Sequence, residues 1–196
     1  MKHNGFEYVD LGLPSGTKWA KYNVGAYSET DNGLYFPFGG TVGLDSPYYE
    51  GNFVSHKLKF NGDKKATLNL DNDAAHIHMG GKWHMPTKEQ FEELLDEKNT
   101  VSTWIYDYCI REVSGRLFRS RINDETLFIP ANGFISNHQY VQNGQTCSLW
   151  TSSIDFSSVY NCTDFFCDKY NTYLARTSAY YVCIGIRGVF NTFWIN

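Results

Sequence analysis

The sequence predicts an α+β fold in which two helices pack on antiparallel sheets and the second half of the chain is mostly β. Extended segments come first, two helical patterns lie between residues 71 and 97, and short strands separated by turns follow from Val101 onward. Strands and helices do not alternate along the chain, as they would in a parallel sheet with helical crossovers. The order of the elements therefore favours antiparallel pairing.

The N-terminal part has the pattern of a hairpin followed by a long loop. Two extended stretches within residues 6–20 flank a Pro14-Ser15-Gly16 turn, where Pro and Gly supply the dihedral angles of a tight turn. Residues 25–66 are rich in Gly, Tyr, Asn and Asp and have no sustained period, which predicts an irregular connection. We expect aromatic side chains to anchor it, among them Tyr35, Phe36 and Phe38.

Capping signals mark both predicted helices. An Asp-rich start at residues 71–75 and the Gly80-Gly81 exit predict a short helix, since Asp accepts free amide protons and Gly permits a left-handed exit. Residues 87–90 read Thr-Lys-Glu-Gln, which is a capping box. Apolar residues then recur at helical spacing, so we expect a helix from Lys88 to about Glu97.

The second half predicts short strands at residues 102–109, 115–121, 126–129, 149–152 and 180–187. Side chains alternate between the faces of a strand, so the last of these strands makes a positional prediction. One face should be buried and contain Val182, Ile184 and Ile186. The other face should be exposed and contain Tyr181, Cys183, Gly185 and Arg187. The alternative is that both faces of this strand are covered.

Composition excludes several classes of protein. The 196 residues fit a single domain, 1–196, and 42% hydrophobic with 17% aromatic residues describe a compact globule. The net charge is −4 and no run of Lys or Arg is present, which argues against nucleic acid as a partner. No apolar run approaches the ~20 residues of a membrane span, and no signal peptide is visible. We expect no membrane insertion.

The five cysteines do not form the pattern of a disulfide framework, because their number is odd and their spacing irregular. We expect Cys162, Cys167 and Cys183 to be free thiols. Four of the five follow residue 140, so they concentrate in the C-terminal part of the chain.

Three sequence blocks resemble a known family. They are YVDLGLPSGTKWA at residues 8–20, GGKWHMPT at residues 80–87, and LWTSS at residues 149–153 with IRGV at residues 186–189. Together they are similar to a paralogous surface-protein domain of gut Bacteroidetes, which belongs to the C-type-lectin-like group. The C-terminal stretch resembles the variable region of diversity-generating retroelement targets, such as the phage major tropism determinant. The resemblance implies a C-type-lectin-like fold, whose first and last strands pair and bring Tyr8 close to Val189.

In that family, adenines in a template repeat are randomised, so the variable codons give Tyr, Ser, Phe, Cys, Asn, Asp and Thr but never Glu, Gln, Met, Trp or Lys. Residues 151–190 contain 26 of these favoured residues among 40, and Lys169 is the one exception. The bias fits a variable ligand-binding region at about 151–187. An aromatic, Ser-rich sheet without diversification would have a similar composition.

Tyr, Ser and Asn give contact area and adaptable hydrogen bonds, which recognition surfaces favour. We therefore predict a ligand-binding set drawn from the C-terminal region: Phe156, Ser157, Ser158, Tyr160, Asn161, Tyr170, Asn171, Tyr173, Tyr180, Tyr181 and Cys183. Residues 156–161 have no clean period and are expected to form a loop. His138 and Tyr140 are weaker candidates for the rim of the surface. The tyrosines at 160, 173, 180 and 181 should converge on one exposed patch.

Catalytic and metal-binding functions have little support. His76, His78 and His84 lie close in sequence, but His-x-His at a helix end points its two rings apart, so surface or packing histidines are the simpler interpretation. The tripeptides of calcium-dependent sugar sites are absent. Cys162 and Cys167 are the nearest match to the reactive cysteines of formylglycine-generating relatives, without their flanking motif. We expect no metal, no cofactor and no enzyme activity.

The sequence thus predicts a receptor-binding protein with a diversified surface, which binds a protein or glycan ligand on a cell surface. Its expected location is extracellular, on a phage particle or a bacterial cell surface. The alternative is a non-diversified structural or adhesive module of a bacterial cell envelope, which uses residues 25–66 for assembly. A neighbouring reverse-transcriptase gene with a template repeat would favour the first hypothesis, and a lipoprotein signal upstream would favour the second.

Overall fold

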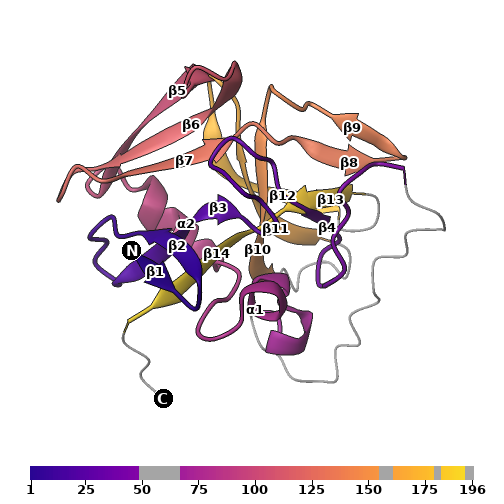
Figure 1. Ribbon diagram of the computed structural model, residues 1–196, viewed down its shortest axis with the longest axis horizontal. Coiled ribbons are helices and arrows are strands. Elements are labelled where there is room, and N and C mark those ends of the chain that lie inside the picture. The colour runs from indigo at the N-terminus through magenta and orange to yellow at the C-terminus, as the bar shows by residue number, and fades with distance from the viewer. Residues whose placement is uncertain (49–66, 155–160, 179–181, 193–196) are drawn as a thin grey trace.

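The computed structural model describes residues 1–48, 67–154, 161–178 and 182–192, which form three β-sheets and two short helices (Figure 1). The predicted mixture of two helices with mostly antiparallel strands is confirmed at this level. No helix in these ranges is long and apolar enough to cross a bilayer.

A four-stranded antiparallel sheet joins the two ends of the chain. Its order is β1-β2-β3-β14, with strands Lys2–His3, Phe6–Val9, Thr17–Asn23 and Arg187–Asn191. Trp19 is the register partner of both Val9 and Val189, so it lies between the first and last parts of the chain. The rings of Tyr8 and Phe190 also meet edge to face at 5.1 Å. The predicted proximity of Tyr8 and Val189 is therefore confirmed.

A seven-stranded sheet forms the centre of the molecule. Six strands follow the order β12-β11-β10-β13-β8-β9, and β4 also pairs with β13. The only parallel pair among the described strands of this sheet is β10 with β13. The bounds are Tyr35–Phe36 for β4, Phe134–Ser136 for β8, Gln139–Val141 for β9, Cys147–Ile154 for β10, Asn161–Cys167 for β11, Thr172–Ser178 for β12 and Val182–Gly185 for β13.

A three-stranded antiparallel sheet lies beside the central one, at the upper left in Figure 1. It consists of β5 (Thr100–Tyr108), β6 (Val113–Ser120) and β7 (Thr126–Pro130). Gly115 on β6 has to be glycine, because a Cβ there would lie 2.3 Å from the Ile129 carbonyl oxygen and 2.5 Å from the Phe128 ring. These three strands agree with the sequence prediction within two residues at each end.

Both helices begin with the predicted caps. The Asp73 side chain accepts a hydrogen bond from the His76 amide at 2.9 Å and starts α1 (Ala74–Met79), which a 3-10 turn, Leu70–Asn72, precedes. The capping box of Thr87 and Gln90 starts α2 (Lys88–Leu95). Gly80 ends α1 with a positive φ of 64°, as expected of its exit position. Helix α2 ends two residues before the predicted Glu97, because Asp96 leaves the helical conformation.

Two hydrophobic clusters cover opposite faces of β10. Leu149 packs with Trp19, Phe91 and Phe165 in one cluster, whereas the next residue, Trp150, packs with residues of α1 and β13 in the other. Adjacent residues of a strand point to opposite faces, so both faces of this strand are core. The anchoring role expected of Tyr35, Phe36 and Phe38 is confirmed, since all three are buried.

The predicted strand at residues 180–187 is divided between two sheets. Strand β13 belongs to the central sheet and β14 to the terminal one, and Ile186 between them accepts a hydrogen bond from the Val24 amide at 2.8 Å. The predicted burial of Ile184 and Ile186 is confirmed, whereas Val182 on the same face is only partly buried. The predicted exposure of the alternate face is wrong for Cys183, Gly185 and Arg187, which are buried. Both faces of β13 are covered, because Ile184 packs in one hydrophobic cluster and Cys183 packs with Tyr35 and Ile135 in another.

Candidate ligand-binding surface

A hairpin at one edge of the central sheet carries four of the five predicted site residues that the structure describes; the fifth, Cys183, lies on β13. Strands β11 and β12 pair in seven consecutive register positions, from Asn161↔Ser178 to Cys167↔Thr172. Residues 168–171 connect them, and Asp168 closes this turn. One of its carboxylate oxygens accepts hydrogen bonds from the Tyr170 and Asn171 amides, both at 2.7 Å. The Asp168 amide donates to the Asn171 carbonyl at 3.0 Å.

The turn shifts the acidity of its own carboxylate. Desolvation opposes ionisation of Asp168, but the hydrogen bonds that it accepts from Asn171 and Tyr170 outweigh this effect and lower its pKa below the usual value. The charged form is therefore the one that holds the turn closed at neutral pH. This turn is a preorganised support for the side chains that it displays.

Three predicted site residues meet at this turn. Tyr170 is 77% exposed and Tyr173 is 47% exposed, and Asn171 between them is also exposed. The Lys169 ammonium lies 4.5 Å from the centre of the Tyr170 ring. On the paired strand, the Phe166 ring lies 5.2 Å from that of Tyr173. The surface thus combines aromatic rings, an amide and a cation, which are the groups that contact ligands in recognition surfaces.

The neighbouring three-stranded sheet extends this surface and fastens it. Tyr106 on β5 is 65% exposed, and it lies close enough to Lys169 to interact electrostatically. Arg116 on β6 donates a hydrogen bond from Nη2 to the Asp168 carbonyl at 2.6 Å. Its guanidinium also lies over the Trp104 ring at 5.8 Å. The turn therefore has a fixed position relative to β5 and β6.

The opposite face of the hairpin is anchored in the core. Phe165 is fully buried and stacks on Phe91 of α2, with ring centroids 4.9 Å apart and planes 9° from parallel. Leu174 on β12 packs against the same cluster. A buried Phe contributes about 3–5 kcal/mol by the cost of its replacement with Ala. The hairpin thus has one structural face and one face available for contacts.

Most of the other predicted site residues lie outside the described residues: Phe156, Ser157, Ser158, Tyr160, Tyr180 and Tyr181. The convergence of their tyrosines with Tyr173 stays a prediction. Asn161 was predicted to lie in a loop. This prediction is wrong, because Asn161 is the first residue of β11. Its backbone lies six residues along the strand from Cys167, or about 20 Å at ~3.4 Å per residue. Asn161 and Tyr170 therefore do not share one small patch.

Cys183 does not contribute an exposed thiol. Its side chain is 3% exposed, and burial raises its pKa to about 12. The prediction of an accessible Cys183 on the ligand face is therefore wrong. All five cysteines are free thiols in the structure, including Cys162 and Cys167, which are also buried.

The weaker rim candidates lie at the opposite edge of the central sheet. His138 and Tyr140 belong to the β8–β9 hairpin, whereas Tyr173 is on β12. The Tyr140 hydroxyl donates to the Asp45 carbonyl at 3.1 Å, which ties this hairpin to the long connection after β4. Five strand spacings of ~4.8 Å, about 24 Å in total, separate the two edges. The two groups of residues form separate surfaces.

The three neighbouring histidines bind backbone atoms. A ring nitrogen of His76 donates to the Trp83 carbonyl at 3.1 Å, one of His78 donates to the Thr41 carbonyl at 2.9 Å, and one of His84 donates to its neighbour's carbonyl at 2.9 Å. These contacts join α1 to the connections around it. The described ranges contain no group of three or more His, Cys, Asp or Glu side chains that could hold a metal ion.

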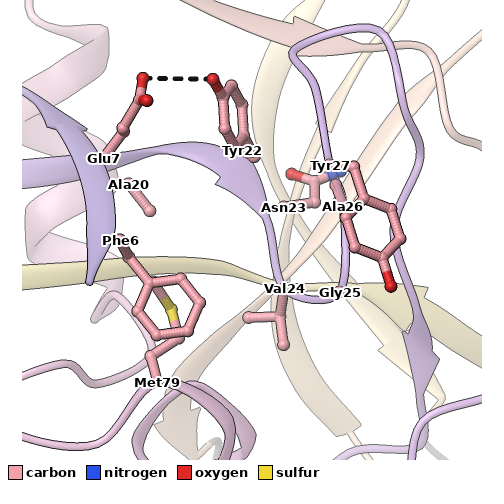
Figure 2. A pocket seen from close by; sticks show the side chains of 10 residues that line it. All are labelled: Phe6, Glu7, Ala20, Tyr22, Asn23, Val24, Gly25, Ala26, Tyr27 and Met79. Atoms are coloured by element: carbon pink, nitrogen blue, oxygen red, sulfur yellow. Dashed lines mark hydrogen bonds between the residues drawn. The ribbon is translucent and has the colours of Figure 1, made fainter. Parts of the chain in front are cut away.

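A pocket of about 230 Å³ lies between β2, β3 and the loop that follows β3 (Figure 2). Its walls are mostly apolar and include Phe6 and Met79. Two of its polar groups have partners: the Tyr22 hydroxyl donates to Glu7 at 3.2 Å, and the Asn23 amide donates to the Asn32 carbonyl at 2.9 Å. None of the predicted site residues that the structure describes lines this pocket.

No protein-family model matches the chain, and no similar curated protein or solved structure is found. The functional argument therefore depends on the geometry of the hairpin surface and on the sequence blocks.

Two features of this surface, the hairpin turn and the contribution of Tyr106, were not predicted from the sequence. Residues 168–171, Asp-Lys-Tyr-Asn, contain typical turn residues, and this signal could have predicted the hairpin. The contribution of Tyr106 has no sequence signal, because it depends on how a separate sheet packs beside the turn.

Proposed function

We propose that this chain is a non-catalytic, ligand-binding protein with a C-type-lectin-like fold, and that the β11–β12 hairpin is part of its recognition surface. The observation that carries the proposal is that one hairpin has both an exposed aromatic face and a face buried in the core. Tyr170 and Tyr173 are exposed, while Phe165 is buried in the core. Exposed aromatic side chains on a rigid support lose little entropy when they bind, which favours recognition.

The fold assignment within this proposal has two supports. The last strand, β14, joins the N-terminal strands in one sheet by pairing with β3 at Trp19, which is similar to the joining of the chain ends in the resembling family. The blocks at residues 8–20, 80–87 and 149–153 contribute Trp19, Trp83 and Trp150, and all three indoles are fully buried. The tryptophans within the resembling blocks are therefore core residues, and a shared fold predicts that resembling residues lie in the core.

A diversified surface is compatible with this arrangement. Substitutions at exposed positions usually change stability by less than about 0.5 kcal/mol, so many side chains are tolerated at Tyr170, Asn171 and Tyr173. The ligand class that we propose is a protein or glycan on a cell surface. The protein itself would act outside the cell, on a phage particle or on a bacterial surface.

The second candidate function is an adhesive or structural module of a bacterial envelope. It is favoured by exposed apolar side chains on the described part of segment 25–66, where Tyr27, Val42 and Tyr48 are each more than three-quarters exposed. Such residues are suited to contacts between envelope proteins.

Two measurements test these proposals. The labelled protein should bind intact cells or an immobilised glycan or protein panel, and unlabelled protein should compete for this binding. The DNA around codons 151–187 should be accompanied by a reverse-transcriptase gene and a near-identical template repeat. Saturable binding without the repeat would support the adhesive module. Absence of binding to every surface tested would contradict both functions.

A further inference from the structure

Two thiols meet beneath the recognition hairpin. Cys147 on β10 and Cys167 on β11 are register partners, and neither side chain is exposed. Their sulfurs are within hydrogen-bonding distance of each other. The Cys147 sulfur also lies 3.3 Å from the Ile129 carbonyl oxygen, which fixes its position. Cα atoms of paired strand residues are about 4.5–5.5 Å apart, within the range that a disulfide spans.

A buried arginine accompanies the two thiols. Arg116 is 7% exposed, and one of its nitrogens, Nε, is buried without a hydrogen-bond partner among the residues that the structure describes. Its guanidinium interacts with Cys167 through charge and a hydrogen bond. A thiolate is a better acceptor than a thiol, so ionised Cys167 would satisfy the charge of this cation more fully.

The two sulfurs differ in acidity. Burial opposes ionisation of both, but the neighbouring Cys147 and the positive charge of Arg116 outweigh it at Cys167 and lower the pKa of that thiol. Burial and the neighbouring Cys167 raise the pKa of Cys147. Thiolates, and not thiols, react with oxidants and disulfides. Cys167 is therefore the reactive member of the pair and Cys147 the resolving member.

We propose that Cys147 and Cys167 form an oxidisable thiol pair, which hydrogen peroxide converts to a disulfide that joins β10 to β11 below the recognition hairpin. The Cys167 thiolate attacks one peroxide oxygen, the O–O bond breaks, and hydroxide leaves, which gives a sulfenic acid. The Cys147 thiol then attacks this sulfur, an S–S bond forms, and the sulfenic oxygen leaves as water. The two cysteines lose two electrons, and the peroxide gains them.

The position of Cys167 gives the oxidant a route. It is the last residue of β11 and precedes the Asp168 turn, so opening of this hairpin end alone would expose it. Strand ends open with a lower free energy than the global unfolding of a domain. Cys147 on the next strand then lies close enough to resolve the sulfenic acid.

The test uses the full chain with Cys109→Ser, because Cys109 is exposed and would otherwise link molecules together. The protein is treated with hydrogen peroxide, denatured, alkylated and digested, and the peptides are identified by mass spectrometry. We expect a Cys147–Cys167 linked peptide that dithiothreitol removes, with Cys162 and Cys183 alkylated. The oxidised protein should melt about 5 °C higher, because the bond closes a loop in the unfolded chain. Recovery of both thiols as alkylated peptides would overturn the proposal.

Arg116 is tested separately as a positioning residue. Arg116→Gln should slow peroxide oxidation about tenfold, and Arg116→Lys should restore part of the rate by keeping the charge. Arg119→Gln is the matched control, because Arg119 is exposed on the same strand and should leave the rate unchanged. An unchanged rate in Arg116→Gln would contradict the role of the cation. The linked peptide in the parent protein does not depend on whether these variants fold.

Discussion

Arg187 connects two sheets through a buried cation, and its replacement tests how this connection contributes to stability. The guanidinium is fully buried and donates to the Asn23 side-chain oxygen at 2.8 Å and to three backbone carbonyls, those of Ala20, Lys21 and Phe128, at 3.1, 2.6 and 3.1 Å. Burial lowers its pKa to about 10. No carboxylate forms a salt bridge with it among the described residues.

Arg187→Met keeps much of the side-chain volume but leaves four acceptors without this donor. Each buried acceptor that loses its partner costs about 1–3 kcal/mol, which gives at least about 4 kcal/mol for the four. Relief of the buried charge offsets part of this cost. We expect a net loss of about 3 kcal/mol in the free energy of unfolding.

The assay is urea unfolding followed by tryptophan fluorescence. With a slope of about 2–3 kcal/mol/M, the midpoint should fall by about 1 M. Arg119→Met is the control, since this exposed arginine should change stability by less than about 0.5 kcal/mol. A midpoint for Arg187→Met within the error of the parent protein would refute the reasoning that the four hydrogen bonds stabilise the sheet junction.

Three further predictions concern the frame and the hairpin. Asn132→Ala should cost about 3 kcal/mol in chemical unfolding, because the buried Asn132 amide bonds both the Ser148 amide and carbonyl at 2.9 Å; a cost below about 1 kcal/mol would contradict this. Thr87→Ala should cost about 1 kcal/mol through loss of the α2 cap, and an unchanged melting temperature would argue against the cap. The pKa of Asp168 is lowered by folding, so its stabilising effect is complete above the ordinary value of 3.8 and is lost as pH falls through the lower folded pKa. Protection of the Tyr170 amide from hydrogen exchange, relative to its intrinsic rate, should decrease in that acid range, and Asp168→Asn should remove this change in protection.

Local signals predicted both helices and the strands β2, β3, β5, β6, β7 and β10, whereas β8, β9, β11 and β12 were not predicted. Thr87 and Gln90 form the capping box that their spacing indicated, and Asp73 caps the short helix. Such elements depend on interactions within a few residues, so a single sequence contains the information that specifies them. The pairing of β2 with β3 in the terminal sheet could also be predicted from the sequence, because the turn at residues 13–16 connects these two strands.

The errors arose where tertiary packing decides the outcome. Alternation along residues 181–187 predicted an exposed Cys183, but Cys183 packs with Tyr35 and Ile135 in a cluster of its own, so the second face of β13 is covered as well. A period-of-two pattern cannot reveal how many layers cover a strand. The thiol pair of Cys147 and Cys167 was also invisible, because strand register brings together residues that are twenty positions apart. Three residues of the predicted ligand face, Tyr170, Asn171 and Tyr173, lie together and exposed at the β11–β12 turn.

The central claim is that the exposed side of the β11–β12 hairpin binds a ligand while its buried side holds the fold. The most direct measurement compares cell-surface or ligand binding and thermal unfolding for Tyr170→Ala, Tyr173→Ala and the buried reference Phe165→Ala. The tyrosine variants should weaken binding at least about tenfold and leave the melting temperature nearly unchanged, whereas Phe165→Ala should cost about 3–5 kcal/mol of stability. Parental binding by both tyrosine variants, or unfolding of both, would contradict the proposed binding surface.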